Sequence, residues 1–365
     1  MADELRAQAV ADGTYKRYSY AIKQWYTWTS QCNYPLFLNN LNAMSQARII
    51  EEFTTYGWFF GFNRKQDGNT YSTLRIRLAA ITFLHEYHGY TNPCKHPSIS
   101  RLMAAIKRQN PPTRKYPITL ELLQLIYQQL NPYSACDTVT WGVMLLGFYF
   151  MLRHSEIVFK TNKVAAKFIL KANHITFLDS QNRPTRTASE SQKVCIFLSA
   201  AKNDQFGKGV YRVVSADPKN SILCPVRATW KALLARQAEP TLPFAQGHQF
   251  RITSASIARI VKKAGQAAGL DPVRFSTISL RSGGATHLLK AGVDPLVIRL
   301  HGRWLSDAFM TYTVISADSM NGVTDLLLNK TSHYDTTLGP SSNPVRGDTA
   351  SPRPHKAKRQ RQNTL

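Results

Sequence analysis

Apolar residues recur with a helical period through the first 109 residues of the chain. The segments that carry this pattern are residues 14–31, 45–62, 70–89 and 97–109. In the third segment, the stripe expected to be buried consists of Leu74, Leu78, Ile81 and Leu84. Arg75 and Arg77 lie off this stripe, so we expect both guanidiniums to be free for phosphates. The pattern predicts a small helical bundle.

The second part of the chain mixes helical patterns with short β-rich runs. Helices are expected over residues 118–130, 140–152, 224–237, 254–269, 278–292 and 294–300. Thr119 and Asp294 are candidate N-caps, and Pro295 takes a first helical position. Alternating runs occur at residues 174–179, 193–199 and 210–215, with a turn rich in Gly, Asn and Asp before the last. The predicted fold class is mainly α-helical with a small antiparallel β-sheet.

Proline and cation content mark a boundary between the two parts. Residues 110–117, NPPTRKYP, contain three prolines and two cations, which predict an extended basic linker. We therefore expect a helical domain over residues 1–109 and a second domain over residues 118–330. Residues 331–365 are polar and proline-rich without a periodic apolar face, so this tail is predicted to be disordered.

The chain is strongly basic, with 46 Lys and Arg against 22 Asp and Glu and a formal net charge of +24. Such a charge attracts polyanions, so nucleic acid is the favoured partner. A membrane partner is not expected, because the sequence has no run of about 18 uncharged apolar residues, no signal peptide and no lipidation motif. The closing run PRPHKAKRQRQ resembles a nuclear localisation signal, although a basic tail also adds nonspecific DNA affinity. If this run acts as a localisation signal, we expect the protein in the nucleus. If it does not, we expect the protein in the cytoplasm.

The cysteines and histidines do not predict a metal site. Five cysteines, an odd number without C-x-x-C spacing, suggest neither a disulfide framework nor a zinc ribbon, and fit a reducing compartment. His85, His88, Cys94 and His96 fall close together within HEYHGYTNPCKH, but their spacing matches no common zinc pattern. We therefore predict no metal and no cofactor.

Residues 278–287, ISLRSGGATH, place Arg281 before two glycines near the start of an apolar helix. Burying this arginine unpaired would be costly. A guanidinium fixed by the scaffold suits a phosphate, and we expect the small residues beside it to let a bulky anion approach. Three further runs carry reactive side chains: MLRHSE with Arg153, AAKNDQFGKG with Lys202, and LHGRWLSDAFMTY with Tyr312.

In this order, the four runs resemble the tyrosine recombinases, and the resemblance extends from about Thr14 to Leu328. The runs KNDQFGKG and RSGGAT are most similar to those of recombinases from eukaryotic Crypton and DIRS-type mobile elements. The resemblance implies a helical core-binding domain that clamps DNA, followed by a catalytic domain of the DNA breaking-rejoining fold. It also implies site-specific cleavage and rejoining for integration and excision of a mobile element.

The resemblance assigns Tyr312 as the nucleophile that forms a 3′-phosphotyrosine and frees a 5′-hydroxyl. Arg153 and Arg281 would bind the nonbridging oxygens, because planar guanidiniums match phosphate geometry. Glu156 follows Arg153 by three residues, which suits an ion pair that orients the guanidinium. Lys202 would protonate the leaving 5′-oxygen. This chemistry requires neither ATP nor a metal.

The chain departs from the family pattern at two positions. Ile278 stands where the family usually has a histidine or lysine, and isoleucine transfers no proton. Either Lys202 supplies the proton, with Lys208 in the same turn as a fallback and a histidine assisting, or this copy is impaired. Counting back from the nucleophile places Arg303 where the family usually has His or Trp. The candidates for the remaining phosphate contact are Arg303, Trp304 and His301.

Further basic residues are expected to bind the DNA backbone: Arg75, Arg77, Lys107, Arg108, Arg114, Lys115 and Lys208. Beyond the nucleophile, an apolar face is formed by Met320, Val323, Leu326 and Leu327. In related recombinases such a terminal helix docks on a neighbouring subunit. The resemblance therefore implies a homotetramer on double-stranded DNA that exchanges strands through a Holliday junction.

Two other functions fit parts of the sequence. Residues 286–304 have the pattern helix, glycine turn, helix, which suits a helix-turn-helix regulator or a recombinase fold that binds DNA without cutting it. Ile278 favours that alternative, whereas the presence of the nucleophile, both arginines and the lysine opposes it. A type IB topoisomerase shares the nucleophile and arginines but relaxes supercoils without choosing sites.

Overall fold

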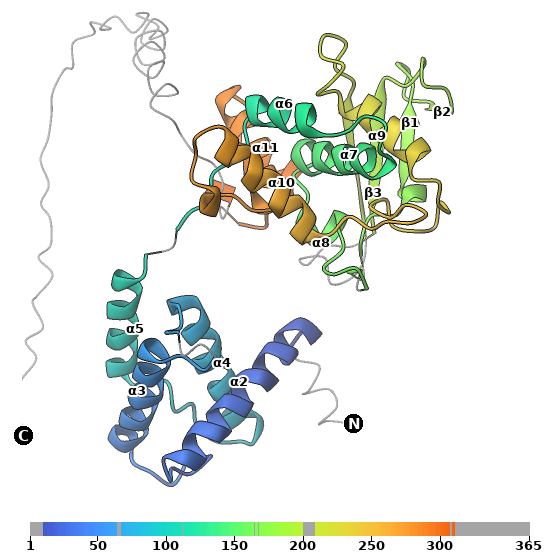
Figure 1. Cartoon of the computed structure of the whole chain (residues 1–365). Coiled ribbons are helices and arrows are strands. Elements are labelled where there is room, and N and C mark those ends of the chain that lie inside the picture. Colours follow the sequence, from blue (N-terminus) through green and yellow to red (C-terminus); the bar gives the residue numbers. More distant parts are fainter. Residues whose placement is uncertain are drawn as a thin grey trace, which may run out of the picture. The chain divides into compact units, whose positions relative to one another are not determined.

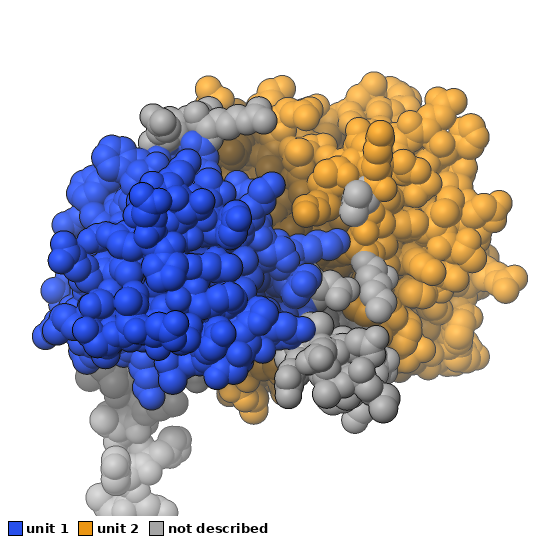
Figure 2. All heavy atoms as spheres, turned by 90° about the horizontal axis from the view of Figure 1, so that it is seen from below, with its two compact units in different colours: residues 1–114 blue, residues 115–365 orange. Residues whose placement is uncertain are grey.

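The computed structural model describes residues 10–63, 67–111, 113–163, 165–166, 168–199, 209–306 and 309–310. The chain forms two compact units, residues 1–114 and residues 115–365, which are coloured separately in Figure 2. The division falls within the residues predicted as a linker, 110–117. The predicted tail, residues 331–365, lies outside the described residues.

Unit 1, residues 1–114, is helical. Its helices are α2 (Asp12–Gln31), α3 (Ala43–Phe59), α4 (Tyr71–Tyr87) and α5 (Pro97–Gln109), which confirms the helical segments predicted there (Figure 1). Side chains of Asn42, Thr70 and His96 cap the last three of these helices by accepting a backbone N–H. The core is aromatic at its centre, where the Trp25 and Phe53 rings meet edge to face with centroids 5.1 Å apart.

His85 is buried in the core of unit 1 and hydrogen-bonds to the main chain. Its Nδ1 lies 2.8 Å from the Ile81 carbonyl oxygen, and its Nε2 lies 3.1 Å from the Leu38 backbone nitrogen. Because a carbonyl only accepts and an N–H only donates, Nδ1 carries the proton and Nε2 accepts. Both ring nitrogens are therefore used by the main chain. Among the described residues, no group of three or more His, Cys, Asp and Glu is placed to hold a metal.

Stability is expected to fall in mild acid because of this histidine. Burial lowers the pKa of His85 below its ordinary value of 6.5. Between the two pKa values the unfolded chain binds a proton that the folded chain does not, so stability is lost as the pH falls through this window. We expect His85→Leu to destabilise the protein by about 1–3 kcal/mol at neutral pH and to weaken the acid sensitivity.

Urea unfolding of the full chain at about pH 7.5 and pH 5.5 measures this effect. His88→Leu is the matched control, because His88 is exposed on the same segment. An equal loss of stability in acid for the wild type and His85→Leu would contradict the assignment.

The structure corrects the expected position of Arg77, which is buried rather than free for phosphates. It is 6% exposed, its Nε donates to Gln24 Oε1 at 2.9 Å, and its guanidinium carbon lies 5.0 Å from the Phe62 ring centroid. Arg77 follows Leu74 by three residues, so it shares the buried face of α4, where an aromatic ring accommodates its charge. Arg75 is exposed, as expected.

The helices of unit 2, residues 115–365, pack around one apolar helix, α7 (Ala135–Tyr149), at the centre of the unit (Figure 1). They are α6 (Leu120–Gln129), α7, α8 (His154–Ile157), α9 (Pro225–Ala235), α10 (Ser254–Ala267), α11 (Ile278–Lys290) and α12 (Pro295–Gly302). The predicted helices are confirmed, whereas the short α8 was not predicted. In α7 every residue from Val139 to Phe148 is buried. A β-carbon at Gly142 would lie 2.6 Å from that of Ala232, so glycine permits α7 to pack closely on α9.

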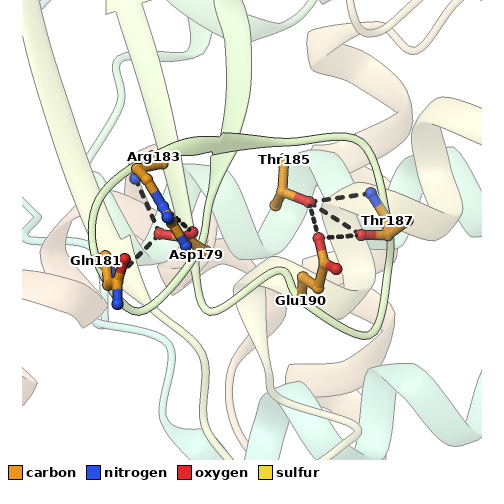
Figure 3. Close-up of polar contacts among 6 residues, drawn as sticks. All are labelled: Asp179, Gln181, Arg183, Thr185, Thr187 and Glu190. Atoms are coloured by element: carbon orange, nitrogen blue, oxygen red, sulfur yellow. Dashed lines mark hydrogen bonds and ion pairs between the residues drawn. The ribbon is translucent and has the colours of Figure 1, made fainter.

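Unit 2 also contains a small sheet with its turns. Strands β1 (Ile175–Leu178), β2 (Pro184–Thr185), β3 (Lys193–Leu198) and β4 (Val210–Ser215) pair in the order β2-β1-β3-β4 and are antiparallel. The two-residue β2 was too short to predict. Figure 3 shows the turns beside it, where Asp179 binds Arg183 and Glu190 accepts from Thr185 and Thr187. No helix among the described residues is long and apolar enough to cross a membrane.

The first residues of unit 2 run beside the segment that leads into α11. The Tyr116 N–H donates to the Arg274 carbonyl at 2.7 Å, and the Ile118 N–H donates to the Ser279 carbonyl at 2.9 Å. The Arg274 guanidinium carbon also lies 4.1 Å from the Tyr116 ring centroid. Residues 115–118 are therefore tied to the start of α11, the helix that carries Arg281.

Candidate active site

Arg281 is held on the first turn of α11 by carbonyls from two other segments. Its side chain is buried, Nη1 donates to the Met151 carbonyl, and Nη2 donates to the Gly302 carbonyl at 2.7 Å. Its guanidinium carbon lies 4.0 Å from the Trp304 ring centroid, a cation–π contact. The ends of α7 and α12 thus fix the plane of this guanidinium, as the sequence predicted for a scaffold-held arginine.

The two glycines after Arg281 have a different role from the one predicted. A β-carbon at Gly283 would lie 2.4 Å from the Ile118 carbonyl oxygen, and one at Gly284 would lie 2.2 Å from the Phe148 carbonyl oxygen. Both glycines therefore face protein backbone rather than an approaching anion. They allow α11 to pack against the residues before α6 and against α7, which places Arg281.

One buried carboxylate joins two further arginines. Glu156 on α8 is 4% exposed, and its Oε1 lies 2.9 Å from Arg153 Nη1. Its Oε2 accepts from the Arg153 backbone N–H at 2.8 Å and lies 2.6 Å from Arg303 Nη2. The predicted ion pair between Arg153 and Glu156 is confirmed. The same carboxylate also orients Arg303, which was not predicted.

Arg303 has donors that no described residue uses. Its side chain is 8% exposed, and both Nε and Nη1 are buried without a hydrogen-bond partner. Burial lowers the pKa of this guanidinium, and the positive charges of Arg153 and Arg212 act in the same direction. Buried N–H groups without partners are costly, so this arrangement suits an anion that supplies the missing acceptors.

His301 and Trp304, the other two candidates for this contact, are engaged with the protein. His301 Nε2 lies 2.8 Å from the Tyr149 carbonyl oxygen and therefore donates to it. Burial lowers the pKa of His301 below its ordinary value, the hydrogen bond to the Tyr149 carbonyl partly opposes this shift, and the charges of Arg212 and Arg303 act with burial. The Trp304 ring packs on Arg281. Of the three candidates, Arg303 is the one whose donors point to a missing ligand.

The structure adds Arg212, which sequence reasoning missed. Arg212 lies on β4, and its Nη2 donates to the Leu300 carbonyl on α12 at 2.9 Å. The alternation of the run VYRVVS contained the signal, because Arg212 shares the inward face of the strand with Val210 and Val214. An inward-facing arginine on a short strand marks a place where its charge has a specific use.

The site is linked in three ways. Arg153 and Arg303 share the Glu156 carboxylate. Arg281 is joined to the turn after α12 through the Gly302 carbonyl and the Trp304 ring. Arg212 binds the Leu300 carbonyl, and its charge acts on His301 and Arg303. Such a site binds an anion with dispersed negative charge, such as a phosphodiester, and neutralises charge that develops on its oxygens. Lys202, Lys208 and Tyr312 lie outside the described residues. Ile278, the first residue of α11, lies one turn before Arg281.

The cations predicted to bind DNA outside this site are largely on the surface. Arg75, Lys107, Arg108 and Arg114 are exposed. Lys115 is half-buried, and its Nζ donates to the Val273 carbonyl at 2.6 Å. Lys107 Nζ lies 5.9 Å from the Tyr71 ring centroid.

No protein-family model matches the chain. A curated relative, the integrase/recombinase xerD homolog of Selenomonas ruminantium, is 29% identical over 247 residues. The match covers 65% of this chain and 66% of that relative, so the chain spans about two thirds of the relative's length.

Solved structures share the fold at low sequence identity. The XerH site-specific recombinase bound to palindromic difH substrate has a TM-score of 0.55 at 15% identity, covering 86% of this chain and 80% of that one. A lambda integrase dimer bound to a COC′ core site has a TM-score of 0.51 at 14% identity, covering 86% of this chain and 93% of that one. The predicted fold class is confirmed: a mainly helical structure with a small antiparallel sheet, shared with tyrosine recombinases. The chain is therefore similar in sequence to an integrase/recombinase over these 247 residues, and it shares the fold of the two recombinase structures.

Proposed function

We propose that the chain is a site-specific DNA recombinase or integrase, a DNA strand transferase that works through a 3′-phosphotyrosine on Tyr312. The observation that carries this proposal is the pairing of Arg153 and Arg303 with the buried carboxylate of Glu156, with unused N–H groups on Arg303. The buried Arg281 is joined to the same turn through the Gly302 carbonyl. A cluster with this excess of positive charge matches a phosphodiester in charge and in hydrogen-bonding capacity.

In the proposed reaction, the Tyr312 phenol releases its proton to water as its oxygen bonds to the scissile phosphorus, and the bond from phosphorus to the 5′-oxygen breaks. The arginines neutralise the charge on the nonbridging oxygens as the phosphorus becomes five-coordinate. Lys202, or Lys208 in the same turn, gives the departing 5′-oxygen its proton. Attack of a 5′-hydroxyl on the phosphotyrosine reverses these steps and reseals the strand without ATP or a metal.

The proposed setting is the movement of a mobile element in a nucleus. The motif resemblance to Crypton and DIRS-type recombinases and the basic run near the carboxyl end support it. We further propose a homotetramer on double-stranded DNA, with the apolar segment around Leu326 docking on a neighbouring subunit and a Holliday junction as intermediate. The net charge of +24 supports a DNA partner, and the XerH and lambda integrase structures named above hold DNA.

The test is covalent capture. The protein is incubated with a pool of labelled, randomised duplexes, each with a nick that lets a short 5′ fragment diffuse away after cleavage and so prevents resealing. We expect a labelled adduct that survives denaturant and disappears with protease, and whose DNA-bearing peptide contains Tyr312. DNA binding without any adduct across the pool, or an adduct on another residue, would contradict the proposed function.

A second candidate function is a recombinase fold that binds DNA but is impaired in cleavage, which Ile278 favours. If Lys202 supplies the proton, Ile278→His should change the cleavage rate by less than about threefold. A rise of about hundredfold or more would instead show that the missing donor limits this copy. Single-turnover adduct formation measures both outcomes, with Ile278→Leu as the control for altered packing at this half-buried position.

A type IB topoisomerase is separated from both candidates by a different assay. Relaxation of a supercoiled plasmid of arbitrary sequence is expected of the topoisomerase. The proposed recombinase should leave such a plasmid supercoiled, because it acts at chosen sites.

A further inference from the structure

Arg212 joins strand β4 to the carboxyl end of helix α12. Its Nη2 donates to the Leu300 carbonyl at 2.9 Å, and its Nη1 donates to the Tyr211 carbonyl at 2.8 Å. The Leu300 carbonyl also accepts the Arg303 backbone N–H at 3.2 Å, which closes the last turn of α12. A cation is favourable there because the last carbonyls of a helix carry partial negative charge. Arg212 thus holds the carbonyl on which the turn at Arg303 depends.

This turn supplies three contacts of the candidate site. The Gly302 carbonyl accepts from Arg281, the Arg303 side chain binds Glu156, and the Trp304 ring packs on Arg281. Arg303 has φ of 59°, a left-handed conformation that residues other than glycine rarely adopt. Such a conformation persists only where the surroundings impose it, and Arg212 is part of those surroundings.

A role in stabilising the sheet does not explain why an arginine occupies position 212. Its Nε is buried without a hydrogen-bond partner, and the ion pairs found within the described residues do not include it. It also lies close enough to His301 and Arg303 for its charge to lower the pKa of both. A half-buried cation set against like charges weakens a fold, and such placements are typical of functional sites.

We propose that Arg212 is a positioning residue for phosphate neutralisation. By binding the Leu300 carbonyl, it fixes the α12 turn so that Arg303 presents Nε and Nη1 to the nonbridging oxygens of the scissile phosphate. This inference rests on the proposed function and extends the site to strand β4. Loss of Arg212 should therefore slow cleavage without weakening the binding of DNA.

A double-mutant cycle tests this coupling. Under single-turnover conditions, Arg212→Met should slow adduct formation by about tenfold or more, with DNA affinity unchanged. The double variant with Arg303→Met should be slowed by less than the product of the two single effects, because Arg212 acts through the turn that positions Arg303. Arg183→Met is the matched control: it removes an arginine from the opposite edge of the sheet, where Arg183 pairs with Asp179 (Figure 3), and should leave the rate unchanged.

A modified substrate separates this role from a general structural one. Once adducts have mapped the scissile position, a methylphosphonate there removes the negative charge of one nonbridging oxygen. On this substrate the loss of cleavage rate in Arg212→Met should shrink to less than about twofold. The neutral methylphosphonate carries less negative charge for the guanidinium groups to neutralise. Additive effects of the two substitutions, or equal defects on both substrates, would overturn the proposal.

Hydrogen exchange on the DNA-free chain gives a readout that does not depend on cleavage. The amides of Arg303 and Trp304 donate to the Leu300 and Arg299 carbonyls, and should exchange faster in Arg212→Met. Arg212→Lys, which keeps a donor for Leu300, should restore part of the protection. Unchanged exchange in Arg212→Met would contradict the positioning role. Absence of any adduct in the wild type would instead count against the proposed function and leave this measurement valid.

Discussion

Replacing Tyr312 with phenylalanine is expected to abolish covalent attachment of the protein to DNA, a loss of at least about 10⁴-fold. Phenylalanine keeps the ring but lacks the oxygen that would bond to phosphorus. The reference pKa of a tyrosine side chain is about 10, so the cationic site must favour the phenolate as the bond forms. Because DNA binding depends on the basic surface rather than on this oxygen, affinity should stay unchanged.

The measurement is adduct formation on the nicked pool, with DNA affinity followed by fluorescence anisotropy at fixed salt. Tyr133→Phe is the matched control, since Tyr133 is 95% exposed in the loop between α6 and α7, and it should retain full activity. An adduct that persists in Tyr312→Phe removes Tyr312 as the nucleophile. Loss of DNA binding together with the adduct would point to misfolding instead.

Replacing Arg281 with lysine is expected to slow cleavage by about 10³-fold, although the charge is kept. The Arg281 guanidinium reaches the Met151 and Gly302 carbonyls at once and packs flat enough for a cation–π contact with Trp304. A single ammonium does not reproduce this planar fork. At least one carbonyl then loses its donor, which should also cost about 1–3 kcal/mol of folding stability.

Single-turnover cleavage and urea unfolding of Arg281→Lys measure the two effects separately. Arg259→Lys is the control for an arginine-to-lysine substitution as such, because Arg259 is exposed on α10. It should change neither the cleavage rate nor the stability. We expect the cleavage rate of Arg281→Lys to fall far more than the fraction of unfolded protein accounts for. A variant that is destabilised but cleaves at the wild-type rate would show that Arg281 supports only the fold.

The helices were predictable from the sequence because their apolar stripes and caps are local signals. Thr119 illustrates this, since its Oγ1 accepts the Leu122 N–H as an N-cap residue should. Arg77 shows the limit of such reasoning. Its position on the stripe of α4 is tolerated because Gln24 and Phe62, which are distant in sequence, provide a partner and a ring.

Except for Arg212, the described members of the candidate site were predictable from the motifs, but their arrangement was not. Nothing local to Arg303 predicts its left-handed backbone or its bond to Glu156, which lies 147 residues away along the chain. Likewise, Gly283 and Gly284 were interpreted as room for an anion, and only the packing of α11 showed that they accommodate backbone. Arg212 was missed because the chain returns to this site through a sheet edge that no motif marks.

The backbone hydrogen bonds between residues 115–118 and the segment that leads into α11 have a consequence for protein engineering. Because Tyr116 and Ile118 hydrogen-bond to Arg274 and Ser279, these linker residues belong structurally to unit 2. A chimera that replaces unit 1 with the corresponding domain of a recombinase such as XerH should therefore be joined before Lys115. A junction placed later would transplant foreign residues into the support of Arg281, and altered target choice could not then be separated from damaged chemistry.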